Sequence, residues 1–222
     1  MVDLQPTPFT TASPVLANYN YNDIINGTGF VKYYGGHTSS GYTLSIQPFY
    51  SEKVMTFAAI DSTTAVKAID LDFDLLFNSP RTIRGVALLN VGVGMKAATQ
   101  GAATRNRTYV VVRIRKWDGT NETEIATAQS TTWTEDPDEE GAEFNGIFSV
   151  SVDIPHTDYS AGETLRITVE LWAWESGYGG LNTTLTHDPK NRSTSVFDDN
   201  NAWDFGADST IMEVTIPFKL DL

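Results

Sequence analysis

The chain has 222 residues, with 15 Lys and Arg against 28 Asp and Glu, and a formal net charge of −13. Charged residues make up 19% and aromatic residues 11%, which argues against disorder and for a folded domain with a sizeable core. The acidity argues against nucleic acid as a partner, and the absence of cysteine excludes disulfides and thiolate metal sites.

The first 24 residues are expected to form an extended arm. Pro6, Pro8 and Pro14 disfavour helix and interior-strand pairing, and the segment has neither the basic nor the apolar part of a signal peptide. We therefore expect no signal peptide and synthesis in a cytoplasm. No later apolar run approaches the ~18 residues that a membrane helix needs, so no membrane partner is expected.

Apolar and polar residues alternate with period two along much of the chain, which predicts strands. The segment 51–67 is the one place where the sequence allows a helical turn. Residues 69–77 alternate strictly, whereas 82–93 is more continuously apolar, as expected for a strand covered on both faces or at a subunit contact. Residues 109–129 contain an Asp-Gly pair between two strand patterns, which predicts a hairpin.

The clearest alternation lies in residues 146–154 and 162–174, joined by a connector rich in turn residues. We expect these two strands to be antiparallel neighbours. A long polar excursion follows at 188–209, and 211–222 closes the chain as a strand. The predicted fold class is all-β: an antiparallel, jelly-roll-like β-sandwich that spans residues 25–222 as a single domain, preceded by the arm of residues 1–24.

Three aspartates, Asp70, Asp72 and Asp74, invite a calcium hypothesis. On a strand, neighbours at i and i+2 lie ~7 Å apart, so the three carboxylates cannot enclose one ion. A solvated strand face is the preferred interpretation. The acidic loops at 135–143 and 198–208 remain the alternative calcium ligands.

The three histidines, His37, His156 and His187, are isolated in the sequence and show no zinc-binding spacing. No Gly-x-Ser-x-Gly elbow and no phosphate-binding loop is present. We therefore expect no metal, no cofactor and no catalytic residue, and predict that the protein is not an enzyme.

Two tryptophans, Trp172 and Trp174, lie on the nominally polar face of the 162–174 strand. A large indole on such a face is covered by a loop, buried at a subunit contact, or offered as a platform for stacking sugars. The same three alternatives apply to Tyr178, Trp203 and Phe205 in the loops that follow. These five residues are the candidate interface or glycan-contact residues.

The proline-rich arm, the segment AGETLRITVELW and the final segment IMEVTIPFKL together resemble jelly-roll virion proteins. The resemblance is to capsid, decoration or fibre-head modules of tailed phages and related environmental viruses, and the strand pattern is also similar to tumour-necrosis-factor-like trimeric fibre heads. It implies a structural, non-enzymatic virion protein that reaches the virion after synthesis in the host cytoplasm. The implied partners are further copies of the chain, with a trimer as one candidate, and other virion proteins.

A carbohydrate-binding β-sandwich module is the alternative function. It would use the exposed tryptophans and the loops at 176–208 to bind a cell-surface glycan. A sandwich hydrolase is the third alternative.

Overall fold

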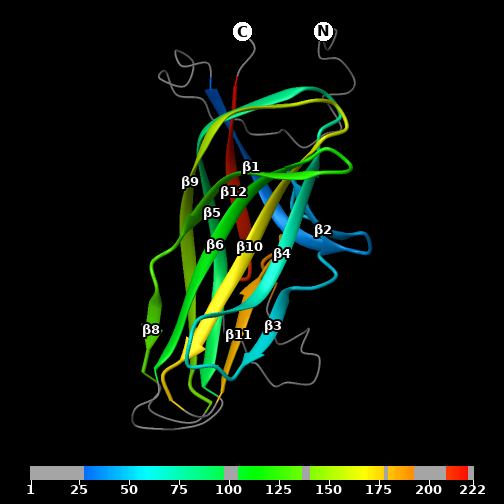
Figure 1. Ribbon diagram of the computed structural model, residues 1–222. Helices are drawn as coiled ribbons and strands as arrows, with labels where there is room; N and C mark the ends of the chain where they lie inside the picture. The colour runs from blue at the N-terminus through cyan, green and yellow to red at the C-terminus, as the bar shows by residue number, and fades with distance from the viewer. Residues whose placement is uncertain (1–27, 98–104, 137–140, 178–179, 193–208, 220–222) are drawn as a thin grey trace.

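The computed structural model describes residues 28–97, 105–136, 141–177, 180–192 and 209–219. They form strands and connecting turns, with no helix in any of these ranges (Figure 1). None of these ranges therefore provides a helix able to cross a membrane. The strands are β1 (Thr28–Thr38), β2 (Gly41–Ser45), β3 (Met55–Ile60), β4 (Val66–Leu76), β5 (Arg81–Ala97), β6 (Asn106–Trp117), β7 (Glu122–Gln129), β8 (Trp133–Glu135), β9 (Glu143–Tyr159), β10 (Thr164–Glu175), β11 (Leu181–Thr186) and β12 (Met212–Lys219).

The all-β prediction is confirmed. The strands follow the order β3-β11-β5-β12-β1-β2-β4-β10-β6-β7, with β8 paired to β6 and β9 paired to β5. All pairings are antiparallel except the bridge between Thr43 of β2 and Asp74 of β4. Figure 1 shows β4, β10 and β6 in front of β9, β5, β12 and β1, so the sheet folds over itself into two layers. The jelly-roll connectivity stays a prediction.

The core lies between these two layers and is built by the alternation seen in the sequence. Phe73 and Ile167 point into it from β4 and β10, and Leu89, Val150 and Val214 point into it from β5, β9 and β12. All five are buried, with exposed fractions of 0–2%. The strand faces predicted to be apolar are therefore the faces that make the core.

The predicted neighbour relation between 146–154 and 162–174 is wrong. β9 pairs with β5, from Arg81 opposite Tyr159 to Lys96 opposite Glu143, whereas β10 pairs with β4 and β6. The two strands follow each other in the chain but belong to opposite layers. Alternation identifies the buried face of each strand, and that face is the same whether the next strand lies beside it or across the core.

The segment 51–67 contains strand β3 instead of a helical turn. β3 pairs along its full length with β11, from Leu181 opposite Ile60 to Thr186 opposite Met55. The hairpin at 109–129 is confirmed, because β6 and β7 pair across the turn at Asp118. The arm at 1–24 and most of the excursion at 188–209 lie outside the described residues.

Candidate functional site

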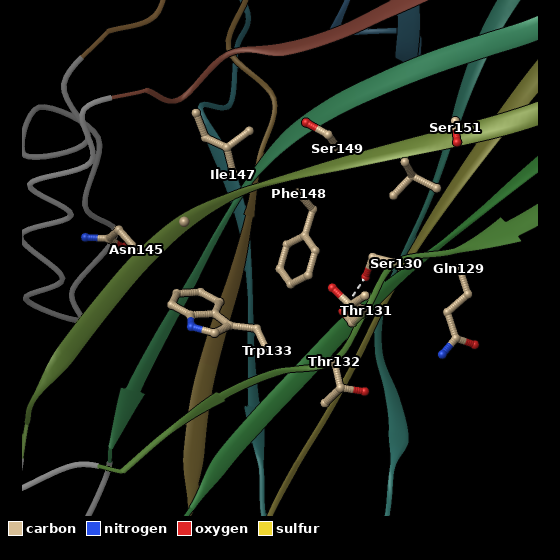
Figure 2. A pocket seen from close by; sticks show the side chains of 12 residues that line it. Gln129, Ser130, Thr131, Thr132, Trp133, Asn145, Ile147, Phe148, Ser149 and Ser151 are labelled. Atoms are coloured by element: carbon tan, nitrogen blue, oxygen red, sulfur yellow. Dashed lines mark hydrogen bonds between the residues drawn. The ribbon is translucent and has the colours of Figure 1, made fainter.

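A groove of about 700 Å³ opens where the segment joining β7 to β8 faces strand β9 (Figure 2). This volume lies within the range of small-ligand sites, about 300–1,000 Å³. One wall is residues 129–133 and the other is residues 145–151. The lining residues are Gln129, Ser130, Thr131, Thr132, Trp133, Asn145, Gly146, Ile147, Phe148, Ser149, Val150 and Ser151.

Trp133 is the central side chain of the groove, and three contacts hold it in place. Its Nε1 donates a hydrogen bond to Glu135 Oε1 at 2.6 Å. Its ring meets Phe148 edge to face, with the ring centroids 6.1 Å apart. A Cβ at Gly146 would lie 3.3 Å from two atoms of the indole, so glycine leaves the room that the ring occupies. Trp133 and Phe148 therefore form a rigid aromatic corner.

One wall of the groove is the irregular segment 130–132 with the ends of β7 and β8 that flank it, and the other is the free edge of β9. Within the described residues, β9 pairs only with β5, and β7 and β8 pair only with β6. No backbone hydrogen bond between those parts of the chain crosses from 129–133 to 145–151. The first wall is fixed from behind, because Ser130 N donates to Val110 O at 2.9 Å and Val110 N donates to Ser130 Oγ at 3.0 Å.

The lining contains hydroxyl, amide and apolar side chains but no charged side chain. Such a surface suits an uncharged ligand that carries both hydrogen-bonding and apolar groups. It holds no carboxylate or imidazole ligand for a metal ion. The groove is not among the sites predicted from the sequence, although residues 146–151 form an uncharged run in a chain of net charge −13.

The predicted contact residues lie elsewhere. Trp172 stacks on Tyr109, with ring centroids 5.9 Å apart and planes 8° apart, and Trp174 meets the same Tyr109 ring edge to face. The Arg107 guanidinium lies 6.0 Å from the centre of the Trp174 ring. The structure thus brings Trp172 and Trp174 together on the outer face of β10, away from the groove, and both are half-buried.

Tyr178, Trp203 and Phe205 lie outside the described residues. Their role, like that of Trp172 and Trp174, stays a prediction. The described part of the chain adds Tyr109 as the ring that joins the two strand tryptophans.

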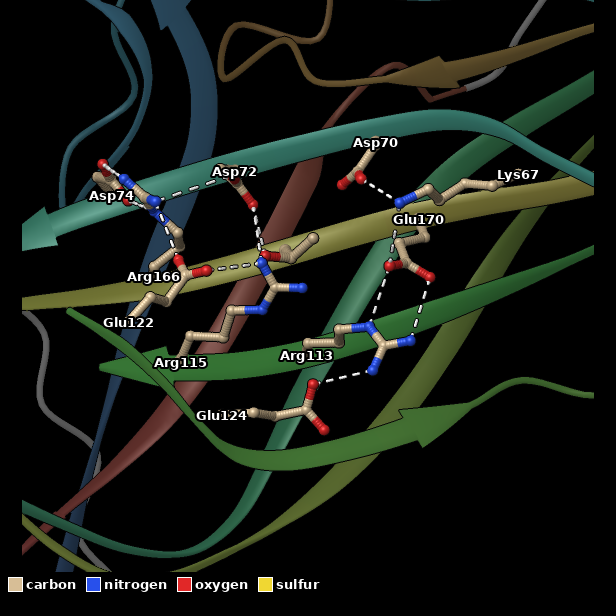
Figure 3. A network of polar contacts seen from close by, with 11 residues as sticks. Lys67, Asp70, Asp72, Asp74, Arg113, Arg115, Glu122, Glu124, Arg166 and Glu170 are labelled. Carbon is tan, nitrogen blue, oxygen red and sulfur yellow. Dashed lines mark hydrogen bonds and ion pairs between the residues drawn. The ribbon is translucent and has the colours of Figure 1, made fainter. Parts of the chain in front are cut away.

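The outer face of β4, β10, β6 and β7 carries rows of opposite charges (Figure 3). Arg166 donates to both carboxylate oxygens of Asp74, at 2.8 and 2.9 Å, and to Glu122 at 2.9 Å. Arg115 lies 3.1 Å from Glu122 and 4.0 Å from Asp72. The aspartate run predicted as a solvated face is therefore largely paired with arginines of β10 and β6.

Glu170 is the least exposed acid of this face, with 4% of its side chain exposed. Arg113 Nε donates to it at 3.0 Å and Trp172 Nε1 at 2.9 Å, while Lys67 Nζ lies 3.6 Å away. Burial alone would raise the pKa of Glu170, but the hydrogen bonds from Arg113 and Trp172 and the nearby positive charges outweigh it and lower the pKa below its usual value. Glu170 is therefore ionised and satisfied.

A second polar cluster surrounds His187, which is completely buried. Its Nε2 lies 3.0 Å from Thr56 Oγ1, which lies 3.1 Å from the Tyr42 hydroxyl. Burial lowers the pKa of His187 to about 4, so the imidazole is neutral at pH 7. Its Nδ1 has no hydrogen-bond partner among the described residues, so no group orients the ring as a catalytic base requires. We assign this cluster to the core.

No family model matches the sequence, and no curated protein matches it. Solved structures do match the fold. An α-amino acid ester hydrolase aligns with a TM-score of 0.52 at 10% identity, over 85% of this chain and 36% of that one. An aminopeptidase from a marine sediment archaeon, Thaumarchaeota archaeon, aligns with a TM-score of 0.51 at 9% identity, over 84% and 36%. A CocE/NonD family hydrolase from Staphylococcus aureus aligns at 0.49 and 15% identity, over 86% and 37%.

These matches overturn the virion prediction. The chain spans little more than a third of the length of the hydrolases it matches. By contrast, the infectious bursal disease virus structure reaches a TM-score of only 0.29, and the tumour necrosis factor Eiger from S. frugiperda only 0.24. The resemblance to capsid, decoration and fibre-head proteins, and the structural virion function inferred from it, are therefore wrong.

The prediction that the protein is not an enzyme is overturned by the same finding, because the folds that match with TM-scores above 0.5 belong to an α-amino acid ester hydrolase and an aminopeptidase. The resemblance had been carried by patterns that many two-layered β-folds share. A proline-rich segment and alternating strands do not separate a virion subunit from part of a hydrolase.

Proposed function

We propose that the protein takes part in the hydrolysis of amino-acid esters or peptides, and that the groove between 129–133 and 145–151 binds the substrate. The fold is shared with an α-amino acid ester hydrolase and an aminopeptidase at TM-scores of 0.52 and 0.51. Since the aligned part is 36% of each of those chains, the chain would supply one part of such an activity.

The observation that carries the proposal is the rigid aromatic corner of Trp133 and Phe148 within an uncharged, hydroxyl-rich groove. Ester and amide groups of a substrate are uncharged. Their carbonyl oxygens accept hydrogen bonds and an amide N–H donates one, and Gln129, Thr132 and Asn145 can match both roles. An apolar substrate side chain would fit against the two rings. Burial against aromatic surfaces is the main source of affinity in sites of this kind.

The groove would bind and orient the substrate. None of its twelve lining residues is a histidine, aspartate or glutamate, so within this part of the chain no side chain can activate a nucleophile. The hydroxyl–imidazole contact of Thr56 and His187 lies in the core cluster and has a weak, unoriented base.

The proposal is tested by titrating the protein with N-acetyl amino-acid methyl esters and with short peptide amides, using calorimetry, and by following their hydrolysis. Trp133→Ala should weaken binding by about tenfold or more, the loss of one aromatic anchor. Trp174→Ala is the matched control, since it removes a half-buried tryptophan that does not line the groove, and should change affinity less than about twofold. Absence of binding to the parent, or equal effects of the two variants, would refute the proposed role of the groove.

A further inference from the structure

We infer that the groove binds its ligand by strand addition: an extended, uncharged peptide segment lies between the two walls and pairs with the free edge of β9. This rests on the proposed function, because it takes the groove as the substrate-binding site. It adds the substrate class, a peptide segment of several residues in β-conformation, and the mode of recognition through backbone hydrogen bonds.

The free edge of β9 is the first support. β9 is 17 residues long, and β5 occupies one of its two edges along most of that length. Alternate residues of the strand direct their N–H and C=O groups away from β5, toward the groove. Edge strands are commonly protected by charged residues or proline. In β9 such residues lie outside the run 146–151, and that run lines the groove; they are Glu143, Asp153, Pro155 and Asp158.

The length of the β9 wall fits a peptide strand. Residues 145–151 extend over roughly 20 Å, which corresponds to a bound segment of about five or six residues. The opposite wall, 129–133, is irregular at 130–132 and is held to β6 at Ser130. A peptide in the groove thus has the free edge of β9 on one side and this segment on the other, with no described backbone bond between the walls to displace.

The side chains of the groove predict which peptides bind. In a strand, every second side chain points to the same face. One set would face the aromatic corner of Trp133 and Phe148 and should be apolar, whereas the other would face the hydroxyls of Ser149 and Ser151 and should be small and polar. Because the protein carries a net charge of −13 and the groove supplies no cation, acidic peptides should be disfavoured.

The test uses the full chain and an acetylated, amidated hexapeptide that alternates leucine or valine with threonine. The probe is compared with the same peptide N-methylated at its central amides, which removes backbone donors but keeps every side chain. Calorimetry should show a loss of about tenfold or more on N-methylation, since strand pairing depends on those donors.

Two protein variants, each of which replaces an exposed aliphatic residue by lysine, complete the test. Ile147→Lys places a charge on the β9 edge at the groove, where 60% of the isoleucine is exposed, and should weaken binding by about fivefold or more. Val86→Lys places the same charge on β5, where 53% of the valine is exposed and the residue does not line the groove, and should leave the affinity within about twofold.

Three outcomes would overturn strand addition. If the N-methylated peptide binds as well as the parent peptide while Trp133→Ala still weakens binding, the groove binds substrate by another mode and the proposed function survives. If a neutral oligosaccharide such as cellohexaose binds the groove and the peptide does not, the ligand class is wrong. If neither peptides nor amino-acid esters bind and Ile147→Lys turns a dimer into a monomer, the β9 edge belongs to a second copy, and the proposed function falls as well.

Discussion

The outer face of β10 and the groove beside β9 differ in whether their polar groups are paired. On the outer face, carboxylates and guanidinium groups stand in register across neighbouring strands, as with Asp74 and Arg166. In the groove, the side chains carry no charge, and β9 has no partner within the described residues on the edge opposite β5. One surface has charged groups that are already paired, and the other has an unpaired strand edge.

This difference shows where binding capacity lies. An ionised side chain that already holds its partner offers little to a ligand, because a new contact must replace an existing one. An unpaired backbone edge gains hydrogen bonds on binding and loses only those to water. The paired charges therefore mark a stable face, and the uncharged run 146–151 marks the candidate site.

The largest expected effect comes from breaking the paired face at its centre. Glu170→Ala leaves the Arg113 guanidinium without its buried partner, and we expect a loss of about 3–5 kcal/mol in the free energy of unfolding. Glu124→Ala removes a more exposed partner of the same arginine, 42% exposed, and should cost below about 1 kcal/mol. Urea denaturation measures both. Equal losses for the two variants would show that burial does not set the strength of this network.

The next effect is a difference in pH dependence: His187 in the core and Glu170 on the charged face should lose their contributions to stability in different pH ranges. Because burial lowers the pKa of His187 to about 4, the unfolded chain binds this proton more readily than the folded protein. Stability should be complete above about pH 6.5 and should fall by roughly 3 kcal/mol as the pH drops to about 4. Glu170, whose pKa is lowered, should keep its contribution above its usual titration range and lose it as the pH falls through that range to the lowered pKa.

Urea denaturation between pH 7 and pH 4 tests this expectation. His37 and Asp188 also act on His187, with opposite signs, so both stay unchanged in the variant protein. His187→Gln should be less stable than the parent at pH 7, since it disturbs the contact with Thr56, but should lose less stability than the parent on acidification. A parallel decline of the two proteins would mean that another group causes the acid sensitivity.

The contrast also shows what the sequence could and could not predict. Alternation identified the core face of each strand, because burial depends on each strand's own period. The partner of β9 was missed, because pairing with β5 joins segments about sixty residues apart and leaves no local pattern. The ion pairs of Asp74 were missed for the same reason: its partner Arg166 is 92 residues away. The groove could not be predicted either, because its two walls, 129–133 and 145–151, come together only in the folded chain.

A smaller effect tests the aromatic corner of the groove. Gly146→Ala brings a Cβ to 3.3 Å from the Trp133 ring, so the ring must shift, whereas in a Trp133→Ala background the same Cβ has space. We expect a coupling of about 1 kcal/mol between the two substitutions in a double-mutant cycle. Thermal or urea unfolding of the four proteins gives this value. Additive effects would show that the indole is not held against Gly146 in solution.

The smallest expected effect is the response of the groove to salt. The paired face depends on Coulomb attraction between partly exposed groups, which salt screens, so raising NaCl from about 0.05 to 0.5 M should reduce the coupling between Arg113 and Glu124. The groove lining has no charged side chain, and an uncharged peptide brings none. Its dissociation constant should therefore change by less than about twofold over the same range. Calorimetry at the two salt concentrations measures it, with a lysine-containing peptide as the control for long-range attraction to the charge of −13. A strong salt dependence for the uncharged peptide would place its binding on the charged face instead of the groove.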